Sequence, residues 1–492
     1  MQKIIFYALG TILVLISCRN PDDSRDTVLT PNPHVAQCDS LAAVYDAVYQ
    51  PTGFVVGVVE GERLIYAKGF GKRNIERQDP VSPTSVFHMA SISKALVATA
   101  VMQLVEQNSV HLDTPLVHYL PYFRLDDDRY KGITIKHILA HRSGIPDVED
   151  EDDYGWANPE YDAGAVERFV EGLADRSLKF SPGEKRSYSN FAYDILADVI
   201  AKVTGSNFER YMKQNIFKPL EMKNSTFLKH RVSRKLAASP HIIDSNTLRY
   251  RVSEVYPYHR AHAASSTFHS NIQDMSLLAN AIQNGWLFKD RQILRTSSFE
   301  QMLSTRLGWN AWEFHGHKAI MSSGSDCGFN SYFLLLPEDS LAVIAMTNCE
   351  RFPTDQVAKD MMSIFLGLSP VEVRKPVSLD FEKWVLEDGI TEALGKFQAL
   401  VDTLPDSYRL DWDNIWFLGY RAMQQGNYPI TISIFDMFAS QFPKDSFTYY
   451  VLGKTYMLKG QDDLAKIYFQ KTLQLNSNHY RARKDLLRVA EN

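Results

Sequence analysis

Runs of apolar and β-branched residues predict a hairpin early in the chain. The runs 53–59 and 64–71 flank a short turn at 60–62, which is typical of two antiparallel strands. A helical stretch over 39–49 precedes them. The later run 95–105 is apolar nearly all round, and such a pattern predicts a helix buried in the middle of a domain.

The first apolar run, by contrast, indicates a targeting segment. Lys3 supplies a positive charge, residues 4–16 are apolar, and Leu15-Ile16-Ser17-Cys18 closes the run, which is too short for a comfortable transmembrane helix. Its end resembles a bacterial lipobox, which implies cleavage before Cys18 and acylation of that cysteine. We expect a lipoprotein signal peptide over 1–17, a polar tether over 18–35, and an extracytoplasmic protein anchored by lipid to a bacterial membrane, on a face left open. The alternative is an ordinary secretory signal.

Length and charge narrow the class of protein. The 492 residues exceed one ordinary core and suggest two or more domains. A net charge of -5 gives no basic footprint for nucleic acid, so no nucleic-acid partner is expected. With Cys18 lipidated, Cys38, Cys327 and Cys349 remain, an odd number that rules out complete intramolecular pairing. A bridge between Cys327 and Cys349 stays open.

The tetrapeptide Ser91-Ile92-Ser93-Lys94 is the strongest candidate for chemistry. A serine hydroxyl needs an adjacent proton acceptor to act as a nucleophile, and a spacing of three places Ser91 and Lys94 on one helix face. Ser91 falls where the predicted helix begins, so the helix dipole favours an alkoxide there. Lys94 and Tyr188 are both candidate bases, and the sequence does not choose between them. The alternative interpretation is a helix-capping serine and an exposed lysine.

Further motifs in the same order strengthen the catalytic interpretation. They are Phe87-His88-Met89-Ala90 before Ser91, the segment 133–147, Ser181-Pro182-Gly183-Glu184, Tyr188-Ser189-Asn190, the segment 216–222, and the segment 328–338. Together, over about residues 40 to 365, they resemble the serine β-lactamase-related family, which includes class C β-lactamases, D-alanyl-D-alanine carboxypeptidases, D-aminopeptidases and esterases.

The resemblance implies an α+β fold, with an antiparallel sheet flanked by helices plus an all-α region and the site between them. It implies that Ser91 is the nucleophile, that Lys94 and Tyr188 transfer protons, and that Asn190 binds substrate. The backbone N–H groups of Ser91 and Ser325 would form the oxyanion hole. Neither a metal nor an organic cofactor is implied.

The third motif of the family departs from its pattern here. Where the family has Lys-Thr-Gly or His-x-Gly, this chain has Ser322-Ser323-Gly324, followed by Ser325. We expect Ser322, Gly324 and Ser325 to contact substrate, but Ser322 offers only a neutral hydrogen bond to a carboxylate, which is weaker than a charge-assisted one. Efficient β-lactam hydrolysis is therefore not expected. His315 or His317 could compensate, although turn and strand positions fit them better, and neither they nor His259 and His262 suggest a metal site.

Two acidic runs, 126–128 and 147–153, are interpreted as solvated loops. A sharper hypothesis for the second run is that it rims the cleft and favours cationic substrates. Its neutralisation should then change the preference between cationic and anionic esters.

Past residue 366 the pattern becomes helical. Two segments superpose with Leu418-Gly419 on Leu452-Gly453 and Phe435 on Phe469, and this spacing is the period of a tetratricopeptide repeat. We expect a hydrolase domain over 36–368, a linker and helix over 369–405, and helical repeats over 406–492, packed against a borrowed helix over 391–404 or against the catalytic domain. A docking site for a protein partner and a stabilising appendage are equally favoured.

Two functions follow from these patterns. The first is an envelope serine hydrolase that forms an acyl-enzyme on Ser91 with a peptide, amide or ester. The second is a catalytically relaxed binding or scaffold protein whose repeats recruit a partner. The intact Ser91, Lys94, Tyr188 and Asn190 favour the first, and Ser322 is the best argument for the second.

Overall fold

The structure, a computed structural model, describes residues 33–149, 151–368 and 372–491. The signal peptide predicted over 1–17, the lipidation site Cys18 and most of the tether lie outside these residues. Residues 33–35, expected to end the tether, already belong to helix α1 (Pro33–Tyr49). Within the described ranges, no helix has the length and apolar character needed to cross a membrane.

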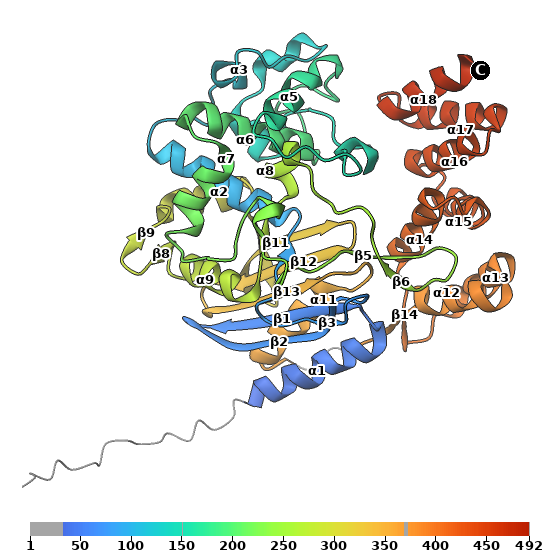
Figure 1. Cartoon of the computed structure of the whole chain (residues 1–492), viewed down its shortest axis with the longest axis horizontal. Helices are drawn as coiled ribbons and strands as arrows, with labels where there is room; N and C mark the ends of the chain where they lie inside the picture. The colour runs from blue at the N-terminus through green and yellow to red at the C-terminus, as the bar shows by residue number, and fades with distance from the viewer. Residues whose placement is uncertain (1–32, 150, 369–371, 492) are drawn as a thin grey trace, which may run out of the picture.

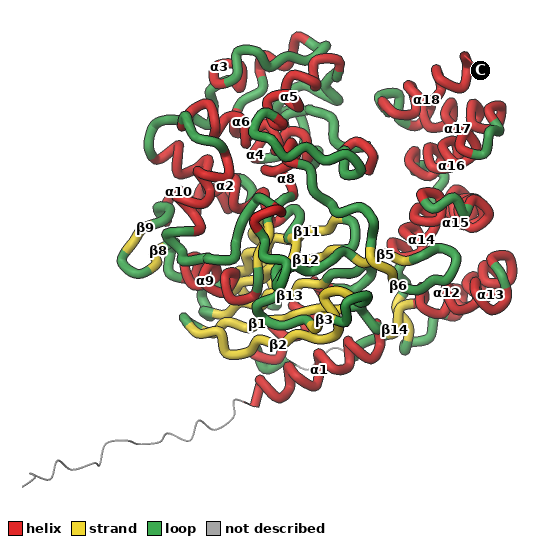
Figure 2. Tube along the Cα trace, in the orientation of Figure 1, coloured by secondary structure: helices red, strands yellow, loops and turns green. Residues whose placement is uncertain are grey.

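A seven-stranded antiparallel sheet forms the centre of the catalytic domain (Figure 2). Its strand order is β10-β11-β12-β13-β1-β2-β3, so strand β1 from the N-terminal hairpin pairs with a strand from the far end of the domain. The strands are β1 (Gly53–Glu60), β2 (Arg63–Asn74), β3 (Asp79–Pro80), β10 (Asn310–Phe314), β11 (His317–Asp326), β12 (Phe329–Leu336) and β13 (Leu341–Thr347). The predicted hairpin is β1 and β2.

The two faces of the sheet carry separate hydrophobic cores. Along β1, Phe54, Val56 and Val58 face the first core, which α1 and α11 (Thr354–Phe365) cover. Val55 faces the second, larger core, which contains the apolar helix α2 (Ile92–Glu106). A strand buried on both faces has a continuous apolar sequence, which is what residues 53–59 show.

The helices of the second core form the all-α part of the domain, as expected, except α9 (Ile272–Gln283), which packs on strands β1 and β13 of the sheet (Figure 1). The cleft that contains Ser91 lies between this part and the sheet. The helices are α3 (Leu116–Tyr119), α4 (Ile135–Leu139), α5 (Ala165–Glu171), α6 (Asn190–Thr204), α7 (Phe208–Met212), α8 (Ala263–Ser266), α9 (Ile272–Gln283) and α10 (Thr296–Thr305). Four short pairs complete the strands: β4 (Phe87–His88) with β7 (His269–Ser270), β5 (His241–Ile243) with β6 (Tyr250–Val252), β8 (Leu287–Phe288) with β9 (Arg291–Gln292), and β14 (Lys375–Pro376) with β15 (Tyr408–Arg409).

The C-terminal part is all helical. Its helices are α12 (Val377–Asp388), α13 (Ile390–Thr403), α14 (Trp412–Gln424), α15 (Tyr428–Gln441), α16 (Ser446–Leu458), α17 (Asp462–Leu475) and α18 (Tyr480–Glu491). The two glycines that superpose in sequence occupy the same place in successive hairpins: a side chain at Gly419 would strike Ile434, and one at Gly453 would strike Phe469. Helix α13 corresponds to the borrowed helix expected over 391–404, and Phe397 lies in the shared core.

The helical region (orange to red in Figure 1) lies along one side of the catalytic domain. Near the sheet, Arg421 of α14 pairs with Glu350 at 2.8 Å. The side-chain amide of Gln425 donates to the carbonyl of Ile243 at 2.9 Å and accepts from the backbone N–H of Ser245 at 2.7 Å. These contacts fix α14 against the domain that carries the site.

Candidate active site

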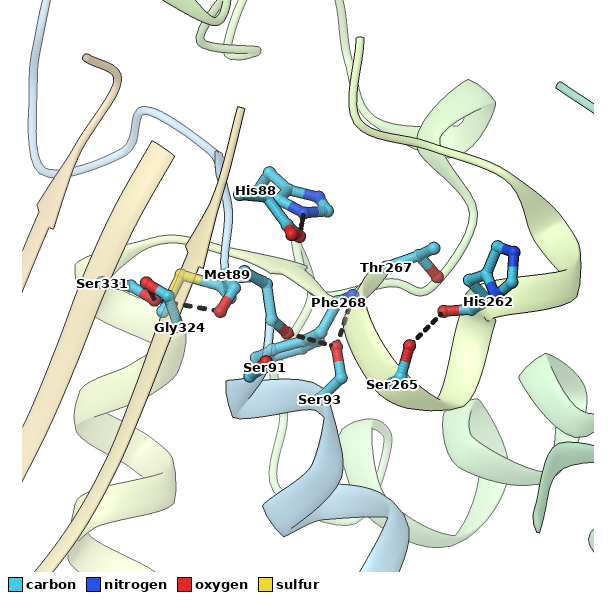
Figure 3. Close-up of polar contacts among 12 residues, drawn as sticks. His88, Met89, Ser91, Ser93, His262, Ser265, Thr267, Phe268, Gly324 and Ser331 are labelled. Carbon is cyan, nitrogen blue, oxygen red and sulfur yellow. Dashed lines mark hydrogen bonds and ion pairs between the residues drawn. The ribbon is translucent and has the colours of Figure 1, made fainter. Parts of the chain in front are cut away.

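Ser91 lies at the N-terminal end of α2, as the sequence predicts. The residue before it, Ala90, has φ of 46°, in the left-handed region that costs energy for a residue with a side chain. Hydrogen bonds hold this strained turn on both sides (Figure 3): Ser331 Oγ donates to the Met89 carbonyl at 2.9 Å, and Ser93 Oγ donates to the Ala90 carbonyl at 2.7 Å. Ser91 is therefore held in place by surroundings that over-determine this turn.

The structure brings Lys94, Tyr188 and Asn190 together around Ser91. Lys94 Nζ lies 3.0 Å from Ser91 Oγ, and Tyr188 Oη lies 2.9 Å from the same oxygen. Lys94 Nζ also donates to Asn190 Oδ1 at 2.6 Å. Lys94 comes from α2, whereas Asn190 begins α6 and Tyr188 lies just before it, so the fold joins two segments that are distant in sequence.

A second acceptor fixes Lys94 from behind. Its Nζ donates to the carbonyl of Ser265 at 2.8 Å, in the short helix α8. The carboxylate of Asp194 in turn accepts from the backbone N–H of Ser265 at 2.9 Å and lies 2.7 Å from His262 Nδ1. With two fixed acceptors, Lys94 Nζ keeps one position directed at Ser91 Oγ.

Asp147 is a site residue that the sequence analysis missed. Its carboxylate accepts from the backbone N–H of Asn190 at 2.6 Å and from the Asn190 amide at 3.4 Å. The amide is thereby oriented with Oδ1 toward Lys94. Burial raises the pKa of Asp147, and the N–H donors of Asn190 and Val148 oppose that rise. In the sequence it is visible only as the last residue of the segment 133–147 and the first of the acidic run 147–153.

His141 lies beneath Tyr188 and is neutral at ordinary pH. Its ring stacks on Tyr188 with centroids 4.4 Å apart, and its Nδ1 accepts from the backbone N–H of Ser189 at 3.2 Å. Burial, with the charges of Lys94 and Arg186, lowers the pKa of His141 to about 3. The histidine positions the tyrosine without carrying charge.

Strand β11 passes directly over the turn that carries Ser91. A Cβ atom at Gly324 would lie 2.2 Å from the Met89 carbonyl oxygen and 2.7 Å from the backbone nitrogen of Ser91. Only glycine permits this approach. Ser322 is buried at 4% exposure, and both it and Ser325 line the same cleft as Ser91.

The cleft has a volume of about 580 Å³ and contains two arginines that the sequence analysis missed, Arg186 and Arg306. Arg306 adopts φ of 56° at the end of α10. The histidines considered as compensation lie elsewhere: His315 occupies a turn with φ of 49°, and His317 pairs with Asp339 at 2.8 Å. Within the described ranges, no group of three or more His, Cys, Asp or Glu side chains could hold a metal ion.

The hypothesis of an acidic rim is wrong for the members of the run whose side chains are described. Asp147 is buried behind Asn190. Glu149 accepts from the backbone N–H groups of Tyr480 at 2.9 Å and of Arg481, and Asp153 pairs with the Arg481 side chain. The carboxylates of Glu149 and Asp153 therefore bind residues of α18 instead of facing solvent.

The three remaining cysteines are buried thiols. Cys38 lies in the core between α1 and the sheet, whereas Cys327 and Cys349 lie in two different clusters. The bridge considered between Cys327 and Cys349 is not formed.

Comparison with known proteins is consistent with this geometry. A family model described as Beta-lactamase matches residues 39–362. Protein flp of Staphylococcus aureus is 31% identical over 177 residues, which are 36% of this chain and 34% of that protein. A penicillin-binding protein of Bacillus subtilis is 30% identical over 179 residues, or 35% of this chain and 38% of that protein. The chain thus spans little more than a third of the length of these relatives.

Two solved structures have folds similar to that of this chain. An octameric penicillin-binding protein homologue from Pyrococcus abyssi aligns with a TM-score of 0.59 and 26% identity, covering 69% of this chain and 78% of that one. A class C beta lactamase from Rhodobacter sphaeroides aligns with a TM-score of 0.54 and 20% identity, covering 67% of this chain and 99% of that one.

Proposed function

The chain belongs to the beta-lactamase family, and from that premise we propose that it is a serine hydrolase that acts on a peptide, amide or ester through an acyl-enzyme on Ser91. The observation that carries the proposal is the contact of Ser91 Oγ with both Lys94 Nζ at 3.0 Å and Tyr188 Oη at 2.9 Å. A serine so placed has the adjacent proton acceptor that an activated nucleophile needs.

In the acylation step, Ser91 Oγ forms a bond to the substrate carbonyl carbon and gives its proton to the pair of Lys94 and Tyr188. Tyr188 is 41% exposed and Lys94 only 4%, so Tyr188 is the member that can reach the leaving group and return the proton to its nitrogen or oxygen. The bond from the carbonyl carbon to that atom then breaks. The backbone N–H groups of Ser91 and Ser325 hold the developing oxyanion.

Deacylation reverses the roles. A water oxygen attacks the acyl carbonyl carbon, its proton passes to the same pair, and Ser91 Oγ leaves with a proton as the carboxylic product departs. Asn190 keeps Lys94 in place through both steps, because its Oδ1 accepts from Lys94 Nζ at 2.6 Å.

The substrate is proposed not to be a standard β-lactam. A buried hydroxyl at Ser322 stands where the resemblance expects a cation, and the loss of a charge-assisted contact to a carboxylate weakens binding by about 1 to 2 kcal/mol. Turnover of nitrocefin should therefore be much slower than turnover of p-nitrophenyl esters, measured as kcat/KM on the same preparation.

The direct test of the hydrolase is labelling with a fluorophosphonate probe. The wild-type chain should label, Ser91→Ala should not, and Ser304→Ala, which changes an exposed serine of α10, should label like wild type. Absence of Ser91-dependent labelling and of ester turnover would favour the catalytically relaxed binding protein instead. A panel of p-nitrophenyl esters, D-amino-acid amides and D-Ala-D-Ala peptides then defines the substrate class.

We further propose that the enzyme works outside the cytoplasm, anchored through an acylated Cys18. The support is the sequence 1–18 alone. Metabolic labelling with radioactive palmitate should mark the wild-type protein in a bacterial host, and Cys18→Ala should remove the label and release the protein from the membrane fraction. Labelling that persists in Cys18→Ala would overturn the anchor.

A further inference from the structure

A second cavity continues the nucleophile cleft. It has a volume of about 720 Å³, and its lining shares Ser325, Asn330, Thr354 and Asp355 with the cleft that contains Ser91. The two cavities therefore form one groove, which begins at the nucleophile and passes the end of strand β11.

The helical region supplies one wall of this second cavity. Arg409 of β15 and Trp412 and Phe417 of α14 line it on one side, and Tyr154 and Trp156 of the catalytic domain line it on the other. The wall is fixed, because Arg421 of the same helix α14 pairs with Glu350 at 2.8 Å. The groove is complete only when both parts of the chain are present.

Two side chains that line this cavity each have a hydrogen-bond donor atom without a partner among the described residues. The atoms are Nε1 of Trp156 and Nε of Arg409, and both atoms are buried. The Trp156 ring is only 7% exposed and stacks on Tyr154 with centroids 4.6 Å apart, so it is held in place. A buried donor without a partner is costly, and each such group requires an explanation. Acceptor atoms of a ligand would satisfy both.

The backbone of β11 leads from Ser91 into the cavity. Strand β10 pairs with β11 only as far as Met321, so within the described residues no strand pairs with 322–326 on that side. An extended peptide that places its carbonyl group at Ser91 can lie along this free edge. Continued past Ser325, the same peptide enters the cavity lined by Asp326, Cys327 and Trp156.

We propose that this second cavity is a substrate subsite that binds the extended part of a peptide substrate, beyond the bond that Ser91 attacks. Backbone carbonyl oxygens of the peptide accept from Trp156 Nε1 and Arg409 Nε, and its side chains pack on the aromatic rings. The helical region is then part of the substrate-binding surface. This inference rests on the proposed hydrolase function for its kinetic test and on binding alone for its second test.

The kinetic test measures kcat/KM for p-nitrophenyl acetate and for N-acetyl-alanyl p-nitrophenyl esters with one to three alanines, in L and D forms. A parallel series of acetyl-alanyl-peptides extended on the leaving-group side is followed by mass spectrometry. In the wild type, kcat/KM should rise with the number of alanines in one of the two series. Trp156→Phe keeps an aromatic ring but removes the N–H together with the pyrrole part of the indole, so it should lower kcat/KM for the longest substrate about fivefold to tenfold more than for the acetate.

Two further variants sharpen the kinetic test. Arg409→Met keeps the aliphatic stem and should show the same length-dependent loss. Trp312→Phe changes a 39% exposed tryptophan of β10 that does not line the cavity, and it should show no length-dependent loss. The subsite is overturned if wild-type kcat/KM does not change with substrate length in either series. It is also overturned if Trp156→Phe lowers kcat/KM equally for short and long substrates.

A binding experiment separates failure of the subsite from failure of the hydrolase. Fluorescein-labelled acetyl-tetraalanine, in L and D forms, is titrated with the full-length Ser91→Ala protein, and anisotropy is recorded. Binding that weakens at least fivefold on adding Trp156→Phe supports the subsite even if no Ser91-dependent turnover exists. Binding that is absent, or equal in both proteins, overturns it even if the short esters are hydrolysed.

Discussion

The contacts inside the catalytic domain differ in kind from the contacts inside the helical region. Around Ser91, side chains and backbone from α2, α6, α8 and β11 meet at close range, although these elements come from widely separated parts of the sequence. In the helical region each helix packs chiefly on its neighbour, as Gly453 of α16 does on Phe469 of α17. A change in the first region therefore reaches Ser91, whereas a change in the second stays local unless it touches a junction.

The largest contrast is expected between two glycine substitutions. Gly324→Ala places a methyl group 2.2 Å from the Met89 carbonyl oxygen, so it should lower kcat/KM about 100-fold or more and cost about 1 to 3 kcal/mol in unfolding free energy. Gly395→Ala, in α13, meets nothing within 4 Å and should stabilise the chain by about 0.5 to 1 kcal/mol. Ester hydrolysis and urea unfolding measure both. Normal activity in Gly324→Ala would contradict the close approach of β11.

A smaller contrast is expected between two aspartates that accept from helix N-termini. Asp147 accepts from Asn190, the first residue of α6, and Asp445 accepts from Phe447 and Thr448 of α16. Asp147→Ala frees the Asn190 amide and should lower kcat about tenfold to 100-fold. Asp445→Ala should cost about 1 kcal/mol of stability and leave kcat unchanged. Equal effects on kcat would remove the role of Asp147 in positioning Asn190.

The junction at the last helix should respond to acid. Burial alone would raise the pKa of Glu149, but the hydrogen bond and charge of His479 and the N–H groups of Arg481 and Tyr480 hold it below its usual value. Its contribution to docking is therefore complete above the unfolded pKa of about 4.3 and is lost as the pH falls through the folded value. Hydrogen-exchange protection factors over 480–491 should fall severalfold between pH 7 and pH 3.5.

Two variants control the acid response. In Glu149→Gln the pH-dependent part of this loss should disappear, because the amide does not titrate. Glu392→Gln, on exposed α13, should respond like wild type. A response in Glu149→Gln as large as that of wild type would assign the acid sensitivity to other groups.

The smallest effect is expected from thiol reagents. All three described cysteines are buried in the catalytic domain, and burial, with the charge of Asp39, raises the pKa of Cys38 to about 12. A thiol is reactive only as the thiolate, so DTNB should label the native chain slowly and reducing agent should leave Tm unchanged. Labelling therefore reports opening of the catalytic domain alone. Rapid native labelling of Cys38 would contradict this packing.

Local patterns were enough to predict the hairpin, the buried helix and the start of that helix at Ser91. The motifs around Ser91, Lys94, Tyr188 and Asn190 also predicted four side chains that the structure places together. The four side chains lie together because each motif places its residue on an element whose position the fold determines. The chemical roles of these residues stay predictions.

The acidic run and the arginines show why the remainder of the site was not predicted. Asp147 and Glu149 look alike in sequence, yet one faces Asn190 and the other faces the last helix of the chain. Arg186 and Arg306 carry no spacing signal, and they lie in the cleft only because two distant segments converge there. Burial and partners of this kind arise from tertiary contacts, which periodicity does not encode.

The pairing of β1 with β13 bears on the order in which the chain can fold during synthesis. Phe54 lies opposite Thr347 at the middle of the sheet, so the first strands made wait, without their central neighbour, until almost the whole catalytic domain has left the ribosome. Such non-local pairing is slow and leaves apolar strands open meanwhile. The helical region is made last and joins a sheet that can already be complete. A chain that stops after α11 should therefore complete its sheet, whereas one that stops before β11 should not.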